Sequence, residues 1–74
     1  MTKYILRERI PESLSVLREQ ADFIGIHYSS LTLEDDHSVI KTRGPIPRAK
    51  IRALGELGYR VTELTDIESN GVIQ

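Results

Sequence analysis

The 74-residue chain has no cysteine and no tryptophan, and only 5% of its residues are aromatic. Without a thiol it can form no disulfide, no thiolate nucleophile and no cysteine-ligated metal site. No stretch approaches the roughly 18 consecutive apolar residues that a membrane-spanning helix needs, and no segment has the pattern of a signal peptide. We therefore expect a cytoplasmic protein that does not enter a membrane.

Neither sign of charge predominates, because the chain has 10 Lys and Arg residues and 11 Asp and Glu residues, which gives a formal net charge of −1. A dedicated non-specific nucleic-acid binder is normally basic overall, and a DNA mimic is strongly acidic, so neither class is favoured. The length predicts one domain over residues 1–74. Residues 66–74 are expected to form a tail or a short extra hairpin, since Asn70-Gly71 is a hairpin-turn signal.

Two Ile-Pro steps each lead into an amphipathic pattern that a glycine ends. Proline suits the first helical position, where an N–H would have no partner, and glycine suits the left-handed residue after a helix. We therefore predict helices that begin at Pro11 and Pro47 and end before Gly25 and Gly58. Their predicted buried stripes are Leu14, Leu17, Ala21 and Ile24 in the first, and Ile46, Ala49, Ala53, Leu54 and Leu57 in the second.

Alternating apolar residues predict four strands, over residues 2–9, 26–33, 38–43 and 59–65. In the second strand the alternation changes parity at Ser29-Ser30, where a bulge would restore one buried face. Right-handed crossovers place both helices on one face of a four-stranded antiparallel sheet, with the first and third strands central. The predicted fold class is therefore α+β, a ferredoxin-like βαββαβ sandwich.

Three stretches resemble an ACT-type regulatory domain, namely residues 10–14, 24–28 and 53–61. ACT domains often carry a Pro-Gly pair, a Gly-Ile-Asn-Ile step and a Leu-x-x-x-Gly-Tyr-x-Val ending at these places. The resemblance implies the same fold, and a sensor that binds an amino acid at a dimer interface. Glu12 stands where the family usually has the glycine that lets the backbone approach this ligand. Heavy-metal-associated domains share the topology but bind metal through cysteines, which this chain lacks.

Basic residues gather in two places, on the outward parity of the first and third strands and on the outer face of the second helix. Such groups can hold an anionic partner, either an acidic protein surface or a nucleic-acid backbone. The alternative is an ordinary solvated face. The predicted partner-binding residues are Arg7, Arg9, Lys41 and Arg43 on the sheet, with Arg48, Ile51 and Arg52 on the helix.

Exposed apolar residues are a second indication of a docking surface. Ile5 is expected on the open side of the sheet, and Val16 and Phe23 fall off the buried stripe of the first helix. Several such residues on a small domain can form a docking patch.

Catalytic patterns are not evident. The histidines His27 and His37 and the acidic residues 34–36 have no fixed metal-ligand spacing, so residues 34–37 are predicted to be a polar turn. The sequence has no nucleophile–base order, no glycine-rich phosphate loop and no paired catalytic carboxylates. We therefore predict no enzyme, no cofactor and no metal.

The predicted function is a small non-catalytic regulator or inhibitor that docks on a larger protein or nucleoprotein complex, with an acidic surface as one candidate for the contact. Phage proteins that block host defence, such as anti-CRISPR proteins, belong to this size class, and this narrower prediction rests on size and lack of motifs. A homodimer through the sheet is compatible with it. The alternatives are an ACT-like amino-acid sensor and a weak binder of nucleic-acid backbones.

Overall fold

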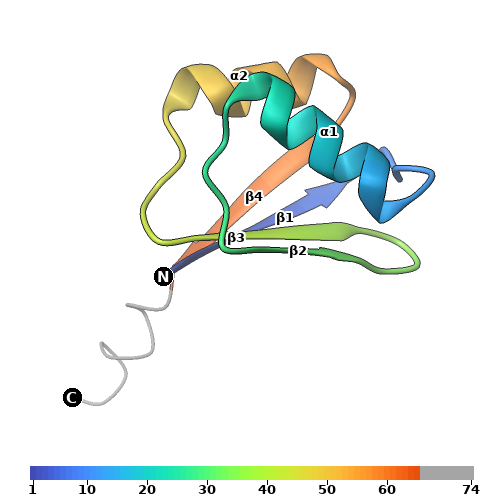
Figure 1. The fold of residues 1–74 in the computed structure, drawn as a ribbon, viewed down its shortest axis with the longest axis horizontal. Helices are drawn as coiled ribbons and strands as arrows, with labels where there is room; N and C mark the ends of the chain where they lie inside the picture. The colour runs from blue at the N-terminus through green and yellow to red at the C-terminus, as the bar shows by residue number, and fades with distance from the viewer. Residues whose placement is uncertain (66–74) are drawn as a thin grey trace.

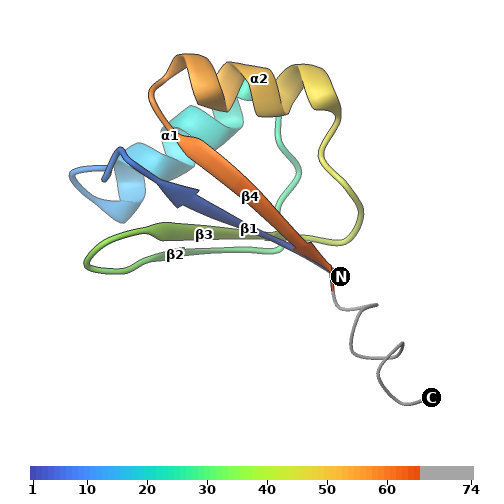
Figure 2. The same ribbon diagram turned by 180° about the vertical axis from the view of Figure 1, so that it is seen from behind.

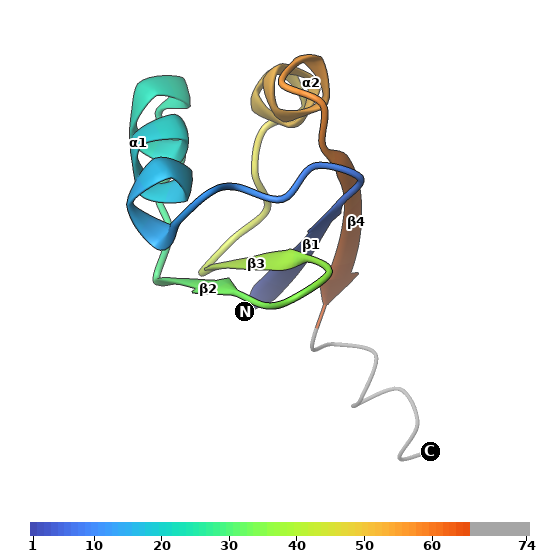
Figure 3. The same ribbon diagram turned by 90° about the vertical axis from the view of Figure 1, so that its right-hand side faces the viewer.

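The computed structural model describes residues 1–65, in which four strands form one antiparallel sheet in the order β2-β3-β1-β4 (Figure 1). The elements are β1 (Thr2–Arg7), α1 (Leu14–Ile24), β2 (Ser30–Leu33), β3 (Ser38–Thr42), α2 (Arg48–Glu56) and β4 (Arg60–Thr65). Figure 3 shows both helices on the same side of the sheet, and no described helix covers the other side. The predicted ferredoxin-like βαββαβ fold is confirmed.

The core lies between the helices and the covered face of the sheet. In the central strands, Tyr4 and Leu6 of β1 and Ile40 of β3 are at most 1% exposed. The helices contribute Leu17, Ala21 and Leu54, each fully buried. Burial of each large apolar side chain stabilises the fold by about 1.5–3 kcal/mol, so this layer holds the fold together.

Helix α1 begins later than its proline predicted. Ser13 is the N-cap, and its hydroxyl oxygen accepts a hydrogen bond from the amide of Val16 at 3.3 Å. Pro11 is buried in the connection before the helix, so its predicted place at the first helical position is wrong. The C-terminal prediction is confirmed, since Gly25 ends the helix in the left-handed region at φ +89°.

Helix α2 keeps part of its predicted buried stripe, since Leu54 is buried and Leu57 packs against the core, but it also turns two unpredicted residues inward. Ile46 and Leu54 are buried as expected, but Ala49 is exposed, while Lys50 and Ile51 are half-buried. Pro47 precedes the helix in an extended conformation, at φ −56° and ψ 145°. Ile46 therefore lies outside the helix, and the helical spacing counted from it does not apply within α2.

Strand ends also differ from the prediction. β1 stops at Arg7 because Glu8 takes a positive φ of +74°, which breaks the extended backbone. β2 begins only at Ser30, and residues 26–29 form a connection without a strand, so the expected bulge is wrong. The change of parity in the sequence marks the start of the strand instead.

The predicted tail or hairpin over residues 66–74 lies outside the described residues. Of the helices in residues 1–65, neither is long and apolar enough to cross a membrane.

Candidate binding surfaces

The open face of the sheet carries alternate residues of all four strands. Cross-strand register aligns one row of Ser30, Lys41, Lys3 and Leu64, and a second row of Thr32, Val39, Ile5 and Thr62. At the centre, Val39 is only 7% exposed and Ile5 is half-buried, although no described helix covers them. The surrounding side chains therefore shield an apolar pair at the middle of this face.

Basic residues of the open face stand directly opposite one another. The register pairs Lys3 with Lys41 between β1 and β3, and Arg7 with Arg60 between β1 and β4. Like charges in directly opposed positions destabilise a sheet. Arg60 relieves this repulsion through an exposed ion pair with Glu8 at 3.2 Å. The cross-strand register thus concentrates positive charge on the open face.

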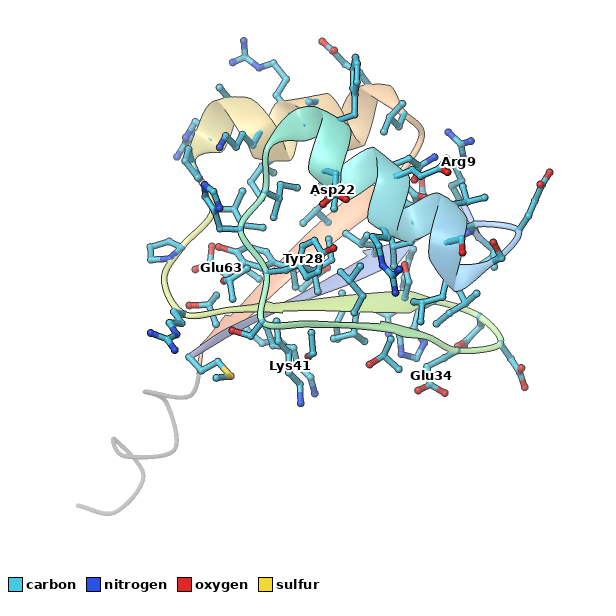
Figure 4. All side chains as sticks on the ribbon, in the orientation of Figure 1. Arg9, Asp22, Tyr28, Glu34, Lys41 and Glu63 are labelled. Atoms are coloured by element: carbon cyan, nitrogen blue, oxygen red, sulfur yellow. The ribbon has the colours of Figure 1, made fainter. Side chains whose placement is uncertain are left out.

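The two lysines lack such relief. Within residues 1–65, neither Lys3 nor Lys41 forms an ion pair with a carboxylate. Figure 4 shows Lys41 pointing away from the helices, on the open side of the sheet. A hollow of about 110 Å³ lies beside the two lysines, lined also by Met1 and Thr2. An incoming carboxylate would meet two unpaired ammonium groups there.

The structure separates the residues that the sequence grouped as one site. Arg7 and Lys41 lie on the open face as predicted. Lys3 and Arg60 complete this face and were missed, although Lys3 has the same strand parity as Arg7. Strand parity could have found Lys3, whereas the register adds that Lys3 stands opposite Lys41 and Arg60 opposite Arg7. We name Lys3, Arg7, Lys41 and Arg60 with Ile5 and Val39 the basic sheet face.

Arg9 is not on the basic sheet face, contrary to the predicted parity. Its guanidinium donates to the carbonyl oxygen of Leu57 at 2.5 Å and lies 5.7 Å from the centre of the Tyr59 ring. The Tyr59 hydroxyl donates to Gln20 at 2.5 Å, and burial raises the pKa of Tyr59 while the charge of Arg9 opposes that rise. Arg9 therefore joins the end of β1 to the α2–β4 connection.

The predicted helix patch is also divided. Arg48 and Arg52 are exposed on α2, but Ile51 packs against the core and is half-buried. Its expected position on the outer face is wrong, because Ile51 rather than the predicted Ala49 joins the inward face of α2. On α1, Phe23 is 92% exposed as its off-stripe position predicted, whereas Val16 is half-buried. Of the apolar residues predicted to be exposed on the helices, only Phe23 is therefore fully accessible to a partner.

The acidic turn between β2 and β3 has its own internal contact. His37 Nδ1 lies 2.6 Å from a carboxylate oxygen of Asp36, and this hydrogen bond lowers the pKa of Asp36. Among residues 1–65, no group of three or more metal-ligating side chains comes together.

Arg43, the last predicted sheet residue, follows β3 and lines a pocket of about 370 Å³. Residues 26–29 and 43–47, together with Lys50, form its walls. Figures 1 and 2 show why these segments meet, since the α1–β2 and β3–α2 connections descend to the same end of the sheet. Sequence reasoning missed this pocket because its two loops are brought together only by the topology.

Comparison with protein-family models, with curated proteins and with solved structures finds no match to this chain. The resemblance to ACT domains therefore stays a prediction from its three sequence stretches. Glu12, at the place of the family's ligand-loop glycine, is exposed in the β1–α1 connection.

Proposed function

We propose that this chain is a non-catalytic binding protein that docks its basic sheet face on an acidic surface of a larger protein. The observation that carries the proposal is the unpaired, directly opposed Lys3–Lys41 pair, which lies next to the half-buried apolar side chain of Ile5. Carboxylates of a partner would remove the repulsion between the lysines when they bind.

An acidic protein is favoured over a nucleic acid because the basic sheet face lacks stacking groups. Sheet-based recognition of single-stranded RNA uses exposed aromatic side chains. Among the described residues, Tyr4 and Tyr59 are buried, Phe23 lies on α1, and Tyr28 lies between α1 and the sheet (Figure 4). None of these four rings faces the open side of the sheet.

A homodimer through this face is disfavoured for an electrostatic reason. In a two-fold dimer the same patch meets itself, which would bring the Lys3–Lys41 pairs of two copies together. The narrower prediction of a defence inhibitor, anti-CRISPR included, rests on chain length and lack of motifs and stays a prediction.

Titration with poly-L-glutamate, followed by amide chemical shifts in two-dimensional NMR, tests the proposal with a defined acidic probe. We expect shifts in β1 and β3 at Lys3, Ile5, Val39 and Lys41. Changing Lys3→Glu and Lys41→Glu together should weaken binding on the order of tenfold or more, since two contacts become repulsive. This double variant keeps like charges in opposed positions, so its thermal stability should stay close to that of the original protein.

The rival helix surface provides the matched comparison. Arg48→Glu with Arg52→Glu makes the same change in net charge on exposed positions of α2, and it should leave poly-L-glutamate affinity nearly unchanged. The proposal is wrong if the shifts fall on α2 and the helix variant loses binding. It is also wrong if single-stranded DNA shifts the same amides with higher affinity, which would indicate the nucleic-acid alternative.

A further inference from the structure

The pocket between the two loops is built around an apolar floor. Ile26 is 5% exposed and Ile46 is 8% exposed, and both belong to the hydrophobic core. Pro45, Pro47 and the half-buried Tyr28 extend this apolar lining. A volume of about 370 Å³ is within the range of roughly 300–1,000 Å³ that small-molecule sites occupy.

Hydrogen bonds between distant segments hold the walls in place. The Ile46 amide donates to the Tyr4 hydroxyl at 2.8 Å in the protein interior, which fixes the β3–α2 connection. Lys50 Nζ donates to the carbonyl oxygen of Gly25 at 2.5 Å, which ties α2 to the end of α1. Figure 4 shows Tyr28 beneath Asp22 of α1, and its hydroxyl donates to that carboxylate at 3.3 Å. Contacts within the chain therefore hold the walls of this pocket.

The polar lining is basic. Its ionisable side chains are His27, Tyr28, Arg43 and Lys50, and among the described residues no carboxylate lines the pocket. Lys50 is engaged with Gly25, but Arg43 and His27 are exposed, and no hydrogen bond occupies their side chains within residues 1–65. An arginine guanidinium offers paired donors that match a carboxylate.

We propose that this pocket binds a small organic acid whose apolar body rests on Ile26 and Ile46 and whose carboxylate meets Arg43. His27 stands on the opposite loop and would add a second donor to the same carboxylate. This site is separate from the basic sheet face, and the inference does not depend on the docking proposal. It also differs from the ligand loop that the ACT resemblance implies, which is the β1–α1 connection around Glu12.

The test is an NMR titration with phenylacetate and isovalerate at millimolar concentration, with phenylacetamide as the uncharged counterpart of phenylacetate. We expect at least one acid to shift the amides of residues 26–29 and 43–46 in a saturable way. Phenylacetamide should bind markedly more weakly, because it lacks the charge that Arg43 recognises. Arg43→Gln should weaken binding of the acid about tenfold, as expected for loss of a charge-assisted hydrogen bond.

Arg18→Gln is the control, since it removes one exposed arginine from α1 outside the pocket and should leave binding unchanged. The inference is overturned if neither acid shifts the pocket amides. It is equally overturned if phenylacetamide binds as tightly as phenylacetate, or if Arg43→Gln and Arg18→Gln bind the acid alike. Shifts confined to Lys3 and Lys41 would also reject it, because they would place the acid on the basic sheet face.

Discussion

The covered and open faces of the sheet differ in packing and in charge, although the same four strands form both. On the covered face, Tyr4, Leu6 and Ile40 are at most 1% exposed and pack against the helices. On the open face, the alternate residues place Lys3 against Lys41 and leave both without an ion pair in residues 1–65. Side chains of a strand alternate between faces, so each strand serves both roles. One face supplies stability, and the other retains an opposed pair of lysines whose repulsion the proposed acidic partner would relieve.

The largest expected difference between the faces comes from deleting an apolar side chain on each. Leu6→Ala should lower the free energy of unfolding by about 2–5 kcal/mol, because a fully buried leucine leaves a cavity. Ile5→Ala on the open face should cost about half as much, since Ile5 is only half-buried. Urea denaturation followed by circular dichroism measures both. Equal losses would show that the open face is covered in solution.

Two tyrosine hydroxyls extend the comparison, because that of Tyr4 forms a buried hydrogen bond and that of Tyr28 an exposed one. Tyr4→Phe should cost about 1–3 kcal/mol, because it leaves the buried amide of Ile46 without its acceptor. Tyr28→Phe removes only the exposed hydrogen bond to Asp22, and thermal melts should detect little change. The comparison fails if Tyr28→Phe is the more destabilising substitution.

The covered face also contains one polar atom that the fold leaves unsatisfied. Ser38 is fully buried, and its hydroxyl has no hydrogen-bond partner among residues 1–65. Ser38→Ala should therefore raise the free energy of unfolding by about 0.5–1 kcal/mol, by removing an unpaired group from the interior. The matched substitution on the open face, Ser30→Ala, should be nearly neutral. A loss of stability in Ser38→Ala would show that the hydroxyl has a partner.

The smallest expected effect concerns the opposed lysines themselves. Lys3→Glu places a carboxylate opposite Lys41 and should raise stability by a few tenths of a kcal/mol at low salt. Adding Lys41→Glu restores a like-charge pair and should remove the gain, and high salt should do the same. Equilibrium unfolding at two ionic strengths measures this. If Lys3→Glu alone destabilises the protein, the repulsion inferred from the register is wrong.

The element order could be predicted because proline and glycine mark helix ends locally. Gly25 ends α1 with the expected left-handed backbone, and Pro47 immediately precedes α2. Two local conformations could not be predicted. The positive φ of Glu8 ended β1 early and removed Arg9 from the open face. The extended backbone at Pro47 placed Ile46 outside α2, and Ile51 rather than Ala49 joins the inward face.

The candidate sites were harder to predict than the fold, because they depend on contacts between distant segments. Strand parity correctly placed Arg7 and Lys41 on the open face, but only the register reveals that Lys3 faces Lys41. The loop pocket depends on two connections that meet at one end of the sheet, and no residue pattern in either loop indicates the other.

The most direct test of the docking claim is affinity capture from cells of the native host with three baits, compared by quantitative mass spectrometry after nuclease treatment. The baits are the original protein, Lys3→Glu with Lys41→Glu, and Arg48→Glu with Arg52→Glu. The docking proposal predicts a protein that the original and the helix variant both retain, and that the sheet variant loses. Equal capture of that protein by the sheet variant, or its loss by the helix variant alone, would contradict the proposal.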